Sequence, residues 1–232
     1  MNILILTPYL PYPLDSGGNT RVFNLIHQLG QHNVNIIMGV ITAELFDPNQ
    51  IRILEHLLPH VSIIRIPYNG SIHSKILYFL ANLIRVDRQL SCRRAKKTIR
   101  NIIKNESIDL VQVEYSQAAR YLPSTGVPSL LVCLEFRLRV LEREAACQTN
   151  PCHRLFSFLK QQIIGTEELS HLTRYQAAIC MSSEDARWLQ TRSPKSRIDV
   201  IANGVDISAF SYKLMSKPPK QLYFIGWFMN HQ

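Results

Sequence analysis

The sequence lacks the cysteine pattern of a disulfide-rich or zinc-binding protein. Its five cysteines form no CxxC pair, and the spacing of Cys147, Cys152 and His153 is unlike the usual zinc pattern. An odd number of cysteines without a framework is typical of reduced thiols. We therefore expect a cytoplasmic protein without a structural metal site.

No hydrophobic run is long enough to cross a bilayer, and none has the form of a secretory signal. The longest apolar stretch after the N-terminus, residues 75–84, is too short to span a membrane. The first residues, MNILILTPYL, carry no basic flank before their apolar run, which favours a buried first strand over a signal peptide. We expect a soluble protein, or one that is peripheral on the inner face of the membrane.

Two nucleotide-binding fingerprints are also missing. No GxGxxG follows the first apolar run, and no Walker pattern occurs anywhere in the chain. The missing GxGxxG argues against a Rossmann dehydrogenase.

The composition that is present is globular and basic. Hydrophobic residues make up 46% and charged residues 19%, and the formal net charge is +9. Such a balance favours nucleotide phosphates, phospholipid surfaces or nucleic acid, although a basic surface without a dedicated ligand gives the same count. Because no recognised nucleic-acid-binding module accompanies the charge, we expect no nucleic-acid partner.

Apolar runs alternate with amphipathic segments along the first 201 residues. Strands are predicted at 3–7, 34–40, 61–66, 108–114, 128–135, 177–182 and 197–201. Helices are predicted at 19–29, 47–58, within 72–104, within 138–175 and at 183–190. Strands separated by helices pair in parallel through right-handed crossovers, so we predict a doubly wound, Rossmann-like α/β sheet.

The composition of the sequence changes after Asp206. Residues 207–220 have few core residues and include Pro218-Pro219, which is typical of a linker. Residues 221–228, QLYFIGWF, then open a new strand. We expect residues 1–206 to form one domain, 207–220 a linker, and 221–232 the first strand of a second domain that the chain does not continue.

Three segments become informative when they are taken together. A Pro-rich loop, residues 7–21, ends in Gly17-Gly18 before a helix that carries Arg21. Residues 175–189 contain CMSSEDARWL, and residues 197–210 contain an Asn-Gly-Val-Asp string followed by a phenylalanine. Each segment alone is also explained by a tight turn, a capped helix or a surface turn.

In order and spacing these segments resemble family 4 glycosyltransferases of the GT-B class. The resemblance rests on Gly17, Gly18, Arg21, CMSSEDARWL, Asn203, Gly204, Val205, Asp206 and Phe210, and on Phe224-Ile225-Gly226, which match the start of the family's second domain. Ala202 stands where the family usually has proline. The resemblance covers essentially the whole chain, as the N-terminal domain of a GT-B fold.

Members of this family move a sugar from a nucleotide-diphosphate donor to an acceptor, usually with retention. The resemblance implies a nucleotide-diphosphate sugar and a glycan or lipid-linked acceptor as partners. It implies no cofactor, because cations and helix N-termini can hold a diphosphate without a metal. It places Gly17 and Gly18 beside the donor's phosphates and sugar, and Asn203 and Gly204 in the substrate site. Arg21 either faces the cleft or lies on a solvated helix face.

Two carboxylates are the candidate catalytic residues. The family often has a histidine at the end of the fourth strand, where this sequence has Glu114. Glu135, at the end of the fifth strand, is the second candidate. Because the carboxyl ends of parallel strands face the ligand, either acid could orient an acceptor hydroxyl or stabilise an oxocarbenium-like centre.

The family's nucleotide contacts lie mostly in its second domain, so we predict that this chain alone does not turn over. It is either a truncated enzyme or one subunit of a two-chain enzyme whose other chain supplies the donor domain. A non-enzymatic basic binding protein is the remaining alternative. The basic region 85–104 favours either an anionic membrane surface or a helix with its apolar side on the sheet and its charged side in solvent.

Overall fold

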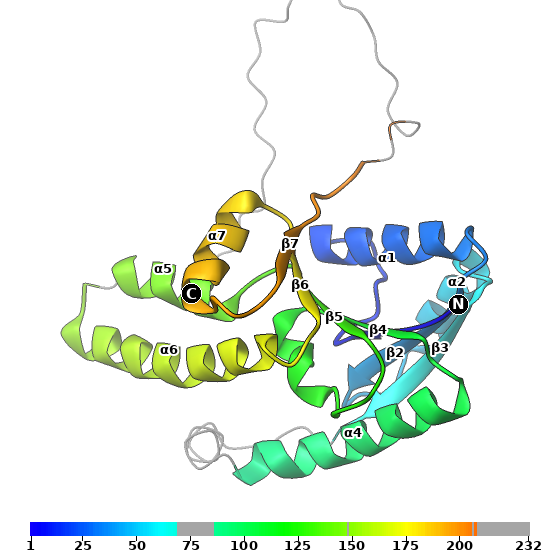
Figure 1. Ribbon diagram of the computed structural model, residues 1–232, viewed down its shortest axis with the longest axis horizontal. Helices are drawn as coiled ribbons and strands as arrows, with labels where there is room; N and C mark the ends of the chain where they lie inside the picture. The colour runs from blue at the N-terminus through cyan, green and yellow to red at the C-terminus, as the bar shows by residue number, and fades with distance from the viewer. Residues whose placement is uncertain (69–85, 148, 206, 208–232) are drawn as a thin grey trace, which may run out of the picture.

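A computed structural model describes residues 1–68, 86–147, 149–205 and 207 (Figure 1). Several sequence predictions lie outside the described residues: the apolar run 75–84, Asp206, Phe210, the body of the predicted linker and the strand at 221–228.

A seven-stranded sheet forms the centre of the molecule, in the order β3-β2-β1-β4-β5-β6-β7, and every pair is parallel. Its strands are β1 (Asn2–Thr7), β2 (Asn35–Thr42), β3 (Val61–Pro67), β4 (Leu110–Glu114), β5 (Ser129–Cys133), β6 (Ala177–Cys180) and β7 (Ile198–Val200). In the register Leu4 lies beside both Ile37 and Val111. The doubly wound parallel sheet predicted from the sequence is confirmed.

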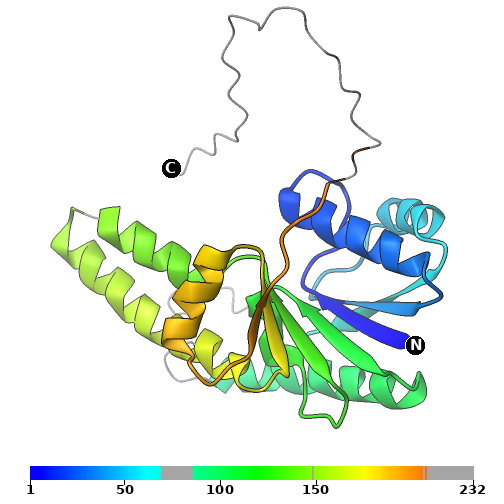
Figure 2. The same ribbon diagram turned by 45° about the horizontal axis from the view of Figure 1, so that its top comes forward.

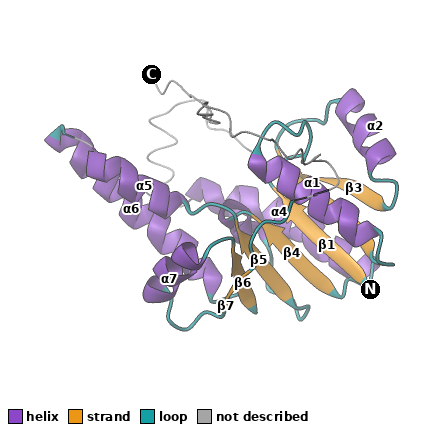
Figure 3. Cartoon of the chain, turned by 90° about the horizontal axis from the view of Figure 1, so that it is seen from above, coloured by secondary structure: helices purple, strands orange, loops and turns teal. Residues whose placement is uncertain are grey.

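Helices cover both faces of the sheet (Figures 2 and 3). The helices are α1 (Gly17–Gly30), α2 (Pro48–Leu57), α4 (Val86–Asn105), α5 (Arg137–Cys147), α6 (Pro151–Leu172) and α7 (Ser183–Arg192). One hydrophobic cluster joins Ile26 of α1 and Leu54 of α2 to the sheet. The other joins Ile99 of α4, Leu172 of α6 and Leu189 of α7 to the opposite face. Burial on both faces explains why the central strands are apolar at successive positions.

The structure adds two features to the predicted order. The helical region predicted within 138–175 consists of two helices, α5 and α6, and Pro151 begins the second. Proline suits that first helical position because its missing N–H would have no helical partner there. A short 3-10 helix, η1 (Ser116–Tyr121), follows β4 directly. The α5–α6 pair extends away from the sheet in Figure 3.

The basic helix α4 packs its apolar side on the sheet along its second half, residues 93–105. Ala95, Ile99 and Ile102 are buried in the core. The exposed cations of that half are Arg93, Arg94, Lys97, Arg100 and Lys104. Within the residues that the structure describes, no helix is both long and apolar enough to cross a membrane.

Candidate functional site

A cavity of about 670 Å³ opens at the carboxyl ends of the central strands. We call it the crevice. Its lining residues are Tyr9, Ser16, Gly17, Gly18, Asn19, Tyr115, Leu134, Glu135, Met181 and Asn203. The structure thus brings together Gly17, Gly18, Glu135 and Asn203, which the sequence predicted as site residues. Gly204 is exposed beside Asn203 and is not among the lining residues.

The N-terminus of α1 faces the crevice. The Ser16 side chain caps the helix by accepting a hydrogen bond from the Asn19 backbone N–H at 3.2 Å. Gly17 has no atom within 4 Å of the place where a Cβ would stand, so this position is open. The remaining first-turn N–H groups and the helix dipole favour an anionic oxygen here.

Gly18 is glycine for a different reason. A Cβ at this position would collide with the Tyr115 hydroxyl and lie 3.3 Å from its Cζ atom. Neither glycine has a positive φ angle. The requirement at Gly18 is therefore space for the tyrosine rather than backbone freedom.

Glu114 ends β4 but lies beneath the crevice, with a side chain that is 0% exposed. Its Oε1 accepts a hydrogen bond from Gln112 Nε2 at 2.5 Å, and its Oε2 is 3.4 Å from Arg21 Nη1. Burial raises the pKa of Glu114 above its ordinary 4.5, while Gln112 and Arg21 oppose that rise. Glu114 is therefore linked to the crevice indirectly, because it pairs with Arg21, which is hydrogen-bonded to the lining residue Asn203.

Arg21 connects three segments that are remote in the sequence. Its Nε donates to Asn203 Oδ1 at 2.8 Å, and its Nη1 pairs with Glu114. The Arg21 side chain is only 15% exposed. Of the two sequence alternatives for Arg21, a solvated helix face is therefore wrong. The arginine points inward and holds the segment after β7 against α1.

The raised pKa of Glu114 predicts a pH-dependent stability. The folded state binds this proton more tightly than the unfolded chain, so the contribution is fully present below about pH 4.5 and is lost as pH rises through the folded pKa. We expect Glu114→Gln to flatten the fall in unfolding free energy as the pH rises above about 4.5. Urea denaturation of both proteins at several pH values measures it. Parallel curves for the two proteins would contradict the expectation.

Glu135 is the carboxylate that lines the crevice. It is exposed, and no described residue pairs with its carboxylate. Its backbone carbonyl accepts a hydrogen bond from the Ser116 hydroxyl at 3.2 Å, which holds the end of β5 next to η1. Glu114 and Glu135, predicted as equivalent candidates, thus differ in access to a substrate.

The N-terminus of α5, close to Glu135, is already occupied by a carboxylate of the protein itself. Glu168 of α6 is buried and accepts hydrogen bonds from the backbone N–H groups of Arg137 at 3.3 Å and Leu138 at 3.0 Å. The Ser116 hydroxyl shares its single proton between Glu168 and the Glu135 carbonyl. Around the crevice, α1 therefore offers its N-terminal amides to a ligand and α5 does not.

Sequence reasoning missed two aromatic residues of the crevice, Tyr9 and Tyr115. Their rings meet edge to face, with centroids 5.8 Å apart. Tyr115 has a φ of 69°, which is rare for a bulky residue. No residue type in this segment signals that angle. The only available clue was the position of Tyr115 directly after the strand-four acid.

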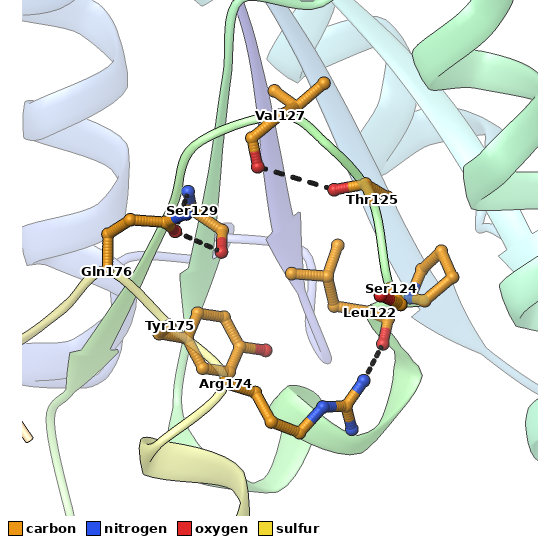
Figure 4. Close-up of a pocket in the computed structure, with 9 residues that line it drawn as sticks. Leu122, Ser124, Thr125, Val127, Ser129, Arg174, Tyr175 and Gln176 are labelled. Carbon is orange, nitrogen blue, oxygen red and sulfur yellow. Dashed lines mark hydrogen bonds between the residues drawn. The ribbon is translucent and has the colours of Figure 1, made fainter.

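A second cavity, of about 200 Å³, lies near the beginnings of β5 and β6, at the opposite edge of the sheet (Figure 4). Gln176 Oε1 accepts from the Ser129 backbone N–H at 2.7 Å, and Arg174 Nη2 donates to the Leu122 carbonyl at 2.9 Å. These polar groups hold loops together.

Across the described part of the chain, no group of three or more metal-ligating side chains is found.

Comparison with solved structures shows the fold of this chain. The sequence matches no protein-family model. No curated protein matches it either. A sucrose-phosphate synthase from Thermosynechococcus elongatus matches in structure with a TM-score of 0.59 and 14% identity, over 90% of this chain and 50% of that one.

Two plant proteins match over a similar extent. A UGT from Medicago truncatula, complexed with UDP-glucose, has a TM-score of 0.55 and 13% identity, over 89% of this chain and 52% of that one. A UDP-glucosyltransferase from Polygonum tinctorium has a TM-score of 0.52 and 11% identity, over 87% and 52%. The chain thus spans about half the length of these solved structures. At such identities the likeness shows the fold alone.

Proposed function

We propose that this chain is the acceptor-side half of a family 4 GT-B glycosyltransferase. In this proposal it takes part in moving a sugar from a nucleotide-diphosphate donor to a glycan or lipid-linked acceptor, with retention. The observation that carries the proposal is the crevice itself, which combines the open N-terminus of α1 with the exposed carboxylate of Glu135. The fold shared with a UGT that was solved with UDP-glucose supports it.

The residues of the crevice suit the two sides of a sugar transfer. The amides of Gly17 and Gly18, at the positive end of α1, would stabilise negative charge on the leaving diphosphate. Glu135 would orient the acceptor hydroxyl. Glu114 would act indirectly, by holding Arg21 and, through it, Asn203 at the rim. None of these roles requires a metal.

The remaining parts of the proposal concern the rest of the enzyme and its location. We expect the donor's base and diphosphate to be held mainly by a second domain, which residues 221–232 would begin after the linker 207–220. We propose that the enzyme supplies this domain, as part of one chain or as a separate chain. The exposed cations of α4 would let a cytoplasmic enzyme approach a lipid-linked acceptor at an anionic membrane surface.

A titration with UDP-glucose tests the site. In protein NMR we expect millimolar UDP-glucose to shift the backbone amide signals of Gly17 and Gly18, because these residues line the crevice and lie in the first turn of α1. Gly126 is the internal control, since it is exposed outside the crevice and has no atom near its missing Cβ. Unchanged signals at the start of α1 would contradict the proposal.

A turnover assay tests whether the chain needs a second domain for activity. The chain incubated with UDP-glucose and a glycan acceptor is expected to release no UDP above the background rate. Sustained release would show that these residues hold the donor without a second domain. Release that appears only after a separate donor domain is added would favour the two-chain form of the proposal.

A further inference from the structure

Tyr115 leaves the extended path of β4 at a left-handed backbone angle. Its φ is 69° and its ψ is 134°, a combination that non-glycine residues rarely adopt. Two hydrogen bonds hold it there. The Tyr115 N–H donates to the Val132 carbonyl of β5 at 3.0 Å, and the Ala118 N–H of η1 donates to the Tyr115 carbonyl at 3.0 Å. Elements on both sides of Tyr115 therefore maintain the unusual angle.

This backbone angle directs the ring over the start of α1. The hydroxyl lies so close to Gly18 that no Cβ could fit there. Tyr9 supports the ring edge to face, and the Gln117 amide donates to the Tyr9 hydroxyl at 2.9 Å. The ring also packs against the hydrophobic cluster beneath α1. The position of Tyr115 is thus determined from several sides.

The Tyr115 hydroxyl, in contrast to its ring, has no hydrogen-bond partner among the described residues, and it belongs to a side chain that lines the crevice. Tyr175 differs in this respect, since its buried hydroxyl donates to the Ala119 carbonyl at 2.9 Å. Burial, with a smaller contribution from Glu114, raises the pKa of Tyr115 to about 12. The phenol stays neutral at physiological pH and keeps its proton to donate.

We infer that Tyr115 is a ligand-binding residue of the crevice, whose hydroxyl donates to a sugar or diphosphate oxygen of the nucleotide sugar bound at the start of α1. The inference rests on the proposed function and names a residue that the motif resemblance does not include. Strain in the backbone and space at Gly18 both serve to present this hydroxyl.

Two phenylalanine variants separate a ligand contact from a packing role. Tyr115→Phe keeps the ring and removes only the hydroxyl, so we expect UDP-glucose to bind about five- to tenfold more weakly, with an unchanged urea midpoint. Tyr175→Phe removes a buried hydrogen bond far from the crevice, so we expect a lower midpoint and unchanged affinity. Affinity is measured by NMR titration and stability by urea denaturation.

A parallel titration with UDP identifies the contacted group. A loss of affinity for UDP-glucose alone assigns the hydroxyl to the sugar, and an equal loss for UDP assigns it to the diphosphate. Equal UDP-glucose affinity of Tyr115→Phe and the wild-type chain would overturn the inference and leave the proposed function standing. Failure of the wild-type chain to bind UDP-glucose would contradict the proposed function, and this inference with it.

Discussion

Replacing Arg21 with methionine is expected to destabilise the folded chain by about 3 kcal/mol at a pH where Glu114 is ionised, because a buried carboxylate then loses its cation. Glu114 is 0% exposed, so solvent cannot compensate for the missing charge. Among the described residues, the Gln112 amide is then its remaining side-chain partner. The same change also removes the hydrogen bond from Arg21 Nε to Asn203.

The pH dependence of this loss distinguishes its cause. Arg21 lowers the pKa of Glu114, so its removal raises that pKa further and Glu114 takes up a proton more readily. The deficit of Arg21→Met, measured by urea denaturation, should therefore shrink as pH falls from 7 toward 5. A deficit that is the same at both pH values would assign the loss to packing alone.

Two variants serve as controls for Arg21. Arg197→Met breaks a 3.0 Å ion pair with Asp199 whose side chains are 74% and 44% exposed, so it should change stability by less than about 0.5 kcal/mol. Asn203→Ala removes only the hydrogen bond to Arg21, which is expected to cost about 1 kcal/mol. Equal losses for Arg21→Met and Arg197→Met would refute the importance of burial at Glu114.

Alanine at Gly18 is expected to destabilise the chain by about 2 kcal/mol, because the new Cβ and the Tyr115 hydroxyl cannot occupy the same space. The tyrosine ring must swing away from Tyr9, which also disturbs the crevice. We expect UDP-glucose to bind at least about tenfold more weakly to this variant, from the combined loss of the ring position and its hydroxyl. Thermal or urea denaturation and NMR titration measure the two effects.

A second substitution should rescue the stability of this variant. In the Gly18→Ala, Tyr115→Phe double variant the hydroxyl is gone, and the nearest remaining atom, Cζ, lies 3.3 Å from the new Cβ. The two changes should therefore be strongly non-additive in a double-mutant cycle. Gly17→Ala is the matched control. Its Cβ enters open space in the first turn of α1, so its stability should be unchanged or slightly higher. Equal losses at Gly17 and Gly18 would contradict the steric account.

The parallel sheet could be predicted from the sequence because buried strands leave a recognisable apolar pattern. Strands such as β1 are covered on both faces, and this burial leaves a continuous apolar run that identifies the strand without any knowledge of its neighbours. The start of α1 was predicted within two residues, because an amphipathic period and a glycine pair mark it locally. The linker 207–220 and the strand at 221–228 stay predictions, since residues 208–232 lie outside the described residues.

Local sequence patterns did not distinguish the two catalytic candidates. Glu114 and Glu135 were both predicted to end a parallel strand. In the structure β4 does end at Glu114, but β5 ends at Cys133, two residues before Glu135. In the structure Glu114 lies beneath the crevice with Arg21, and Glu135 lines it. Each environment is created by side chains from other elements, so no local pattern distinguishes the two acids.

The amino-acid sequence by itself determined the parallel α/β sheet, the edge at which a ligand would bind and the glycine pair at that edge, because burial and helix starts are recorded in local periodicity. Only the tertiary structure decided that Arg21 meets Asn203, 182 positions away, and that Tyr115 turns over Gly18. Those contacts depend on the order β1-β4-β5-β6-β7 in space, which brings the ends of separate strands together. Pairing of this kind is a non-local property, so it leaves no trace in the spacing of neighbouring residues.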